Sequence, residues 1–239
     1  MYKGKKICIV MPAYNAEKTL AATYHDLPHD LVDNVILVDD CSRDKTVEVA
    51  RQLGLTTIVH EHNTGYGGNQ KTCYGAAVKD GADIIVMVHP DHQYDPKFIP
   101  EFIKAMVDEG YLAVFGSRMV NKKNALAGGM PKWKFCFNIL LTKLANLVLG
   151  TDFTELHSGF RAYDKRVFDQ INISNNSDNF IFDTQIIIQL VDKGIKIKEI
   201  PITTRYFPEA SQIGLKPSIR YGLGILKNLF LYKTGLRKF

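Results

Sequence analysis

Three apolar runs that end abruptly in polar side chains constrain the fold of this chain more than any other feature. They are Ile7–Met11, Val35–Val38 and Ile84–Val88. Such continuous apolar stretches are typical of strands buried on both faces, as in parallel sheets covered by helices. Open α/β sheets bind their ligands outside the carboxyl ends of these strands. The polar residues that follow the three runs are therefore expected to line one binding crevice.

Helix-like segments alternate with the strand-like ones along the first half of the chain. The helix-like segments are residues 16–27, 45–53, 69–80 and 96–109, and a further strand-like run covers 57–60. Later segments predict a strand at 112–116 and a second strand that begins at 195 and continues as an extended segment to Tyr206. They also predict helices at about 133–149, at 183–193 and from Lys216 onward. This rhythm predicts an open, mostly parallel, Rossmann-like sheet flanked by helices.

The length and composition fit one large α/β domain. At 239 residues, with 46% hydrophobic and 23% charged residues, the chain matches globular proteins and excludes disordered or fibrous classes. We expect a catalytic or binding domain at 1–211 and a basic amphipathic C-terminal tail at 212–239. No secretory signal is visible and no apolar run reaches the ~18 residues of a membrane span, so a cytoplasmic location is expected.

Basic charge is concentrated in two segments, 118–150 and 212–239. Each holds six basic residues and no acidic residue, whereas the rest of the chain has 18 basic and 25 acidic residues. Apolar residues such as Trp133 and Phe137 accompany the charges at near-helical spacing, which suits either a core-facing stripe or binding to an anionic membrane. Nucleic acid is not expected as a partner, because no reader motif is present. We predict peripheral binding at the inner face of the membrane.

Cysteine and histidine spacing offers little support for a metal cluster or a disulfide scaffold. The four cysteines lie far apart without a C-x-x-C pair, which predicts reduced, mostly buried thiols. A zinc site remains an alternative for the histidines near the expected strand ends, although scattered histidines without a local motif are seldom zinc ligands. These histidines are His60, His62, His89 and His92.

Carboxylates follow two of the expected strands. Asp39 and Asp40 come after Val38, where either one caps the next helix or a carboxylate binds a nucleotide base or ribose. Asp91 lies beside His89 and two residues before Gln93, which offers oxygen ligands to Mg²⁺ or Mn²⁺, with a structural turn as the alternative.

Three further features carry chemistry-bearing side chains. The glycine-rich segment around Gly67 lacks the glycine that a phosphate loop needs before its lysine, so it either brings the backbone close to a ligand or opens a helix. Arg118 suits a phosphate, unless it is a solvated surface arginine. Residues 155–163 gather acid, imidazole, hydroxyl and guanidinium groups, which is uncommon in a structural turn.

Five motifs in this order resemble family 2 of the inverting glycosyltransferases, with the GT-A fold, and within it the dolichyl- and polyprenyl-phosphate sugar synthases. The motifs are MPAYNAE (11–17), VDDCSRDKT (38–46), HPDHQYDP (89–96), FGSR (115–118) and HSGFRAY (157–163). Each is weak alone, but their order and spacing are specific, and the resemblance covers almost the entire chain.

The resemblance implies a role for each matching residue. The nucleotide side would comprise Pro12, Ala13, Tyr14, Glu17 and Asp39, with Asp40, Gly67 and Asp91 beside them. Asp91 and Gln93 would hold Mg²⁺ or Mn²⁺ with the diphosphate, and His89 stands where the family usually has the first aspartate of its Asp-x-Asp. Acceptor phosphate would meet Arg118, Lys134, Ser158 and Arg161. Glu155 and Asp183 would be candidate bases if the acceptor were a hydroxyl.

These expectations lead to three hypotheses. The first is transfer of a hexose, with inversion, from a UDP- or GDP-sugar to a polyprenyl phosphate at the cytoplasmic membrane face. The second is the same fold acting on a hydroxyl of a cell-surface glycan or glycolipid. The third is a non-catalytic nucleotide-binding domain, which the His89 departure suggests and the otherwise intact motifs disfavour.

Overall fold

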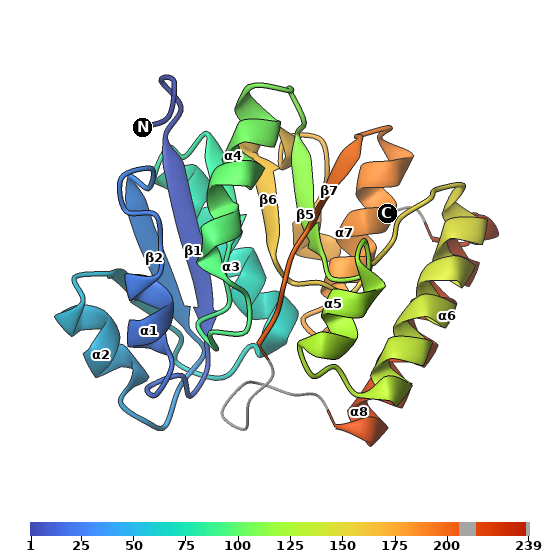
Figure 1. Ribbon diagram of the computed structural model, residues 1–239, viewed down its shortest axis with the longest axis horizontal. Helices are drawn as coiled ribbons and strands as arrows, with labels where there is room; N and C mark the ends of the chain where they lie inside the picture. Colours follow the sequence, from blue (N-terminus) through green and yellow to red (C-terminus); the bar gives the residue numbers. More distant parts are fainter. Residues whose placement is uncertain (206–213, 238–239) are drawn as a thin grey trace.

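The computed structural model describes residues 1–205 and 214–237 and contains one seven-stranded sheet with helices on both faces (Figure 1). The strands are β1 (Ile7–Ala13), β2 (Asn34–Asp39), β3 (Thr56–Val59), β4 (Ile84–Met87), β5 (Ala113–Ser117), β6 (Arg161–Asp164) and β7 (Ile197–Pro201). Their spatial order is β3-β2-β1-β4-β6-β5-β7. Strand β6 is antiparallel to β4 and β5, and the remaining pairs are parallel, which confirms the predicted open, mostly parallel sheet.

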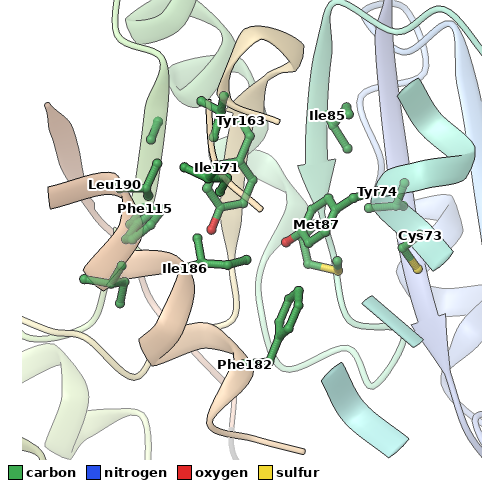
Figure 2. Close-up of a cluster of buried hydrophobic side chains, with 14 of the residues drawn as sticks. Cys73, Tyr74, Ile85, Met87, Phe115, Tyr163, Ile171, Phe182, Ile186 and Leu190 are labelled. Carbon is green, nitrogen blue, oxygen red and sulfur yellow. The ribbon is translucent and has the colours of Figure 1, made fainter. Parts of the chain in front are cut away.

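Helices cover both faces because side chains alternate between the two sides of each buried strand. The helices are α1 (Leu20–His25), α2 (Thr46–Gln52), α3 (Gly65–Lys79), α4 (Ile99–Val107), α5 (Lys122–Ala127), α6 (Lys132–Leu149), α7 (Phe182–Asp192) and α8 (Leu215–Lys233). In β1, Ile9 packs in a cluster with side chains of α1, α2 and α4, whereas Val10 packs in a second cluster with α3 and α7. Figure 2 shows this second cluster, where Tyr74 of α3 contacts Tyr163 and Phe182.

One strand and one α-helix were missing from the sequence prediction. Strand β6 lies between β4 and β5 although its sequence, Arg161 to Asp164, has a charged residue at each end. Charged ends conceal the strand pattern, because a buried arginine is rare unless it is paired. Helix α5 has only six residues and no apolar periodicity long enough to detect.

Helices α6 and α8 pack side by side beyond the β5–β7 end of the sheet (Figure 1). Helix α8 begins close to Lys216, where the sequence predicted it. The predicted domain boundary at 211/212 lies outside the described residues, as does Tyr206, the predicted end of the last extended segment. The division into two parts therefore remains a prediction. In the described part of the chain, no helix has both the length and the apolar character needed to cross a membrane.

All four cysteines are free, but the expectation of mostly buried thiols holds only for Cys8 and Cys73.

Candidate active site

The carboxyl ends of β1, β2 and β4 lie side by side and open into one cavity of about 710 Å³. Ala13 pairs with Asp39 and Val10 pairs with Met87, so the polar residues after the three strands meet at one sheet edge, as predicted. Residues from α6 and α8 form the opposite side of the cavity. The strand-end lining includes Pro12, Ala13, Tyr14, Asp40, His89, Asp91 and Gln93.

Asp39 is the most buried carboxylate among the predicted nucleotide ligands. Its side chain is 1% exposed, and Oδ2 accepts a hydrogen bond from the Ser42 backbone N at 2.9 Å. Oδ1 is buried and has no hydrogen-bond partner in the described part of the chain. Such a group costs free energy unless a ligand or water pairs with it. Asp39 lies beneath the cavity lining, so a base or ribose contact remains a prediction.

Asp40 caps a helix, but a different helix from the one expected. Its carboxylate accepts bonds from the backbone N of Thr64 at 2.7 Å and of Gly65 at 3.0 Å, and so caps α3 rather than α2. Asp44 instead binds the N of Thr46, the first residue of α2. Burial alone would raise the pKa of Asp40, but its hydrogen bonds, with that from His60 the strongest, hold the pKa below its usual value.

Two other predicted nucleotide residues do not line the cavity. Glu17 accepts a hydrogen bond from the Lys45 backbone N at 2.9 Å and borders a separate, smaller pocket. At Gly67, an added Cβ would lie 2.2 Å from the Ser177 backbone O, so this glycine permits close packing of α3 against the residues before α7. The neighbouring Gly65 and Tyr66 do line the cavity.

Asp91 fits a divalent metal site that is completed by substrate. It lines the cavity, and its Oδ1 accepts the Gln93 backbone N–H at 3.1 Å. Burial raises the pKa of this carboxyl because it disfavours the ionised form, and a bound cation would stabilise that form. In residues 1–205 and 214–237, no three His, Cys, Asp or Glu side chains gather to hold an ion. Mg²⁺ commonly uses one or two carboxylates together with substrate phosphates, so a single protein carboxylate is compatible with such a site, and metal binding at Asp91 remains a prediction.

His89 is part of an aromatic stack. Its ring lies 5.7 Å from that of Tyr66, with 6° between the planes, and burial lowers the pKa of the imidazole. His60 and His92, two other histidines of the zinc alternative, each pair with a different carboxylate. His60 pairs with Asp40, and His92 pairs with Asp26. The described residues therefore provide no histidine cluster for zinc.

Arg118 is held by a buried carboxylate at the junction of the sheet edge and α6. Glu155 has a fully buried side chain and accepts bonds from Arg118 backbone N at 2.7 Å, from Arg118 Nε at 2.9 Å and from Asn138 Nδ2 at 2.7 Å. Burial would raise the pKa of Glu155, but the Arg118 charge lowers it below the usual value. The alternative of a solvated surface arginine is wrong, since only 11% of the Arg118 side chain is exposed.

Arg118 and Lys134 line the cavity, whereas Glu155 does not. Burial, followed by the Arg118 charge, lowers the pKa of Lys134. Glu155 is thus placed to orient Arg118, and its role as a base remains a prediction.

Ser158 and Arg161, the other predicted acceptor ligands, are buried in the cavity wall. Arg161 is 1% exposed; it donates to the Ser158 backbone O at 2.8 Å and pairs with Asp183 at 3.3 Å. Ser158 Oγ accepts the Phe160 N–H at 3.3 Å. Asp183 does line the cavity, and it accepts a hydrogen bond from Tyr66 Oη at 2.8 Å. Contact between acceptor phosphate and Ser158 or Arg161 remains a prediction.

The cavity also contains residues that sequence reasoning did not single out. Tyr66, Asn138 and Tyr221 come from three helices, so no local motif connects them. His157 lies in a recognised motif and bonds through Nδ1 to Tyr221 Oη at 3.2 Å, which ties α8 to the site. Burial lowers the pKa of His157 to about 4, so its ring is neutral at neutral pH.

The fold is that of the GT-A glycosyltransferases. Crystal structures of glucosyl-3-phosphoglycerate synthase from Mycobacterium tuberculosis have this fold. One contains Mn²⁺, UDP and glucosyl-3-phosphoglycerate, and it superposes with a TM-score of 0.73 at 18% identity, covering 98% of this chain and 82% of that one. Residues 8–171 match glycosyl transferase family 2, and the chain belongs to that family. It is therefore a glycosyltransferase.

Relatives extend along nearly the whole chain. An uncharacterized protein of Methanocaldococcus jannaschii is 33% identical over 95% of this chain and 92% of its own length. UDP-N-acetylglucosamine–dolichyl-phosphate N-acetylglucosaminyltransferase of Methanococcus voltae is 28% identical over 97% of each chain. Polyprenol monophosphomannose synthase of Mycolicibacterium smegmatis is 24% identical over 83% of this chain and 77% of its own.

Proposed function

We propose that the protein transfers a hexose from a UDP- or GDP-sugar to a polyprenyl phosphate, with inversion at the anomeric carbon. The observation that carries the proposal is the two-sided cavity. Strand ends with Asp40 and Asp91 form its polar side, and Trp133, Phe137, Leu141 and Ile219 of α6 and α8 form its apolar side. A nucleotide suits the first side and a lipid chain the second. The names of two relatives, which contain dolichyl-phosphate and polyprenol, support the same acceptor class.

The cations Arg118 and Lys134 are suited to hold the acceptor phosphate near the anomeric carbon. A phosphate oxygen is already an anionic nucleophile, so this chemistry needs no protein base. Its attack forms the new carbon–oxygen bond as the bond to the nucleoside diphosphate breaks, and the leaving group keeps the electron pair. Glu155 orients Arg118 through several hydrogen bonds, which preserves the geometry of attack.

Asp91, together with Gln93 and His89, would hold Mg²⁺ or Mn²⁺ and with it the donor diphosphate. The bound ion would neutralise charge on the departing nucleoside diphosphate. Asp39, with its unpaired Oδ1, and the Pro12–Tyr14 segment would surround the nucleoside.

The acceptor class is tested by measuring nucleotide release from UDP- and GDP-sugars with Mg²⁺ or Mn²⁺. Polyprenyl phosphate, the matching polyprenol and no acceptor are compared. We expect release to depend on the phosphate. Equal stimulation by polyprenol would contradict the proposal and support transfer to a hydroxyl, for which Asp183 in the cavity is the candidate base.

The outer surface of α6 and α8 is suited to a membrane. Each helix buries one stripe in the core, with Leu141 and Ile225 as examples, and exposes another that includes Leu147 (79%), Leu223 (63%) and Phe230 (61%). Lysines and arginines without acids accompany both stripes. Because each basic side chain near an anionic leaflet contributes about 1 kcal/mol, we propose peripheral binding at the inner membrane face.

Co-sedimentation with vesicles tests this surface. We expect binding to anionic vesicles at low salt, weak binding to neutral ones, and loss of binding for the double variant Leu223→Ser and Phe230→Ser. Val78→Ser, an exposed apolar position on α3, is the matched control and should bind like wild type. Negligible binding to either vesicle type would remove the membrane from the proposal.

A further inference from the structure

Four aromatic rings from three segments of the chain line the same cavity as Asp91. Tyr66 lies in the first turn of α3, His89 and Tyr94 follow β4, and Phe180 precedes α7. All four line the cavity, and we call them the aromatic box. The Tyr66 ring is 5.7 Å from that of His89 and 4.7 Å from that of Phe180, and the His89 and Tyr94 rings are 6.2 Å apart. Phe180 remains 39% exposed. Aromatic side chains that line a cavity with a few convergent polar groups are typical of a ligand site.

A carboxylate adjoins the aromatic box in a fixed orientation. Asp183 Oδ2 accepts a hydrogen bond from Tyr66 Oη at 2.8 Å, and its Oδ1 lies 3.3 Å from Nη1 of the buried Arg161. The guanidinium balances the carboxylate charge inside the wall. An ionised carboxylate can only accept hydrogen bonds, so Asp183 requires donors such as hydroxyl groups from any ligand that reaches it.

Gly159 provides the space that the aromatic box requires. A Cβ at this position would lie 2.6 Å from His89 Nε2 and 3.4 Å from Tyr66 Oη. The Gly159 N–H donates to Tyr94 Oη at 3.0 Å, which fixes a third ring of the box. The ring of His89, in place of a smaller carboxylate, therefore forms part of an organised wall.

We propose that the aromatic box and Asp183 bind the hexose of the donor and select a neutral hexose over a hexuronate. This inference rests on the proposed use of a nucleotide sugar. The C–H bonds on one face of a hexose carry partial positive charge and pack on the negative faces of aromatic rings, while its hydroxyls donate to Asp183. A hexuronate carboxylate would lose its hydration among these rings, and it has no hydrogen to donate to the acceptor-only Asp183. Asp183 is thereby assigned to the donor rather than to deprotonation of an acceptor.

Calorimetry without acceptor tests the inference, using UDP, UDP-glucose and UDP-glucuronate with Mg²⁺, or GDP and GDP-mannose if the protein prefers guanine. Tyr66→Phe removes the hydroxyl that orients Asp183, and Phe180→Ala removes one ring. Each should weaken nucleotide-sugar binding about tenfold, the loss of one hydrogen bond or ring contact, and leave the free nucleotide within about twofold. Tyr111→Ala, a half-buried aromatic that does not line the cavity, is the control and should change neither affinity.

Unchanged nucleotide-sugar affinity in both variants would overturn the aromatic box as the hexose site. Equal binding of UDP-glucose and UDP-glucuronate by the wild type would overturn the selection. If the Asp183→Asn variant binds the nucleotide sugar normally but does not transfer the sugar, Asp183 acts as a base and not as a donor ligand. Because calorimetry uses no acceptor, failure of polyprenyl phosphate as acceptor leaves the two binding outcomes intact, whereas absence of any nucleotide binding contradicts the proposed function itself.

Discussion

Replacing Glu155 by glutamine should destabilise the protein, because Glu155 is the buried counter-charge of Arg118. The glutamine amide keeps one acceptor oxygen and places an NH₂ group against guanidinium donors. Removing one partner of a buried ion pair costs about 3–5 kcal/mol. Arg118 borders the cavity and is 11% exposed, so water partly solvates it, and we expect a loss of about 2–4 kcal/mol.

The loss should depend on pH in a defined direction. Arg118 holds the folded-state pKa of Glu155 below its usual value of 4.5. The stability contributed by the ionised carboxylate is therefore fully present above the unfolded-state pKa and is lost as pH falls through the lower, folded-state pKa. The difference between Glu155→Gln and wild type should be largest near pH 7 and should shrink in acid.

Urea unfolding at pH 7 and at successively lower pH measures this difference. Glu101→Gln, at an exposed position of α4, is the matched control and should change stability by less than about 0.5 kcal/mol. The KM for the acceptor should also rise, since Arg118 loses its orientation. A Glu155→Gln variant as stable as wild type, yet unable to transfer to a hydroxyl acceptor, would refute this reasoning and identify Glu155 as a base.

The remaining predictions concern the metal ligand and the packing of α3. Asp91→Asn should lower transfer by at least about 10³-fold in a nucleotide-release assay and keep the fold, because metal stabilisation of the leaving group amounts to several kcal/mol; normal turnover would exclude Asp91 as the ligand. Gly67→Ala should lose about 1–3 kcal/mol in urea unfolding, since its Cβ would lie 2.2 Å from Ser177 O. Gly75→Ala on the same helix meets nothing within 4 Å and should gain about 0.5–1 kcal/mol, so equal effects at 67 and 75 would contradict the packing argument.

The sequence was sufficient for six of the seven strands and for the location of the site, because continuous apolar strands such as β1 and β4 carry a strong local signal. It placed Asp91 and Arg118 correctly at strand ends that line the cavity. Strand β6 was missed because Arg161, buried and paired with Asp183, hides the pattern of a buried strand. That pairing joins residues far apart in the chain and leaves no local trace.

Individual roles were harder to predict than position. Asp40 caps α3, a helix that begins 25 residues later, and sequence spacing suggested α2 instead. Ser158 and Arg161 share a motif with His157, yet only His157 and Gly159 of this stretch line the cavity. Which side chains of a dense motif face the ligand depends on tertiary packing around them, which spacing alone does not encode.

The most direct test of the central claim is isolation of the lipid product. After incubation with a nucleotide hexose and polyprenyl phosphate, mass spectrometry and NMR determine what the sugar is bonded to and in which anomeric configuration. We predict a hexosyl phosphate diester of the lipid, with the anomeric configuration opposite to that of the donor. A sugar bonded to a carbon-bound hydroxyl, or a product that retains the donor configuration, would contradict the account.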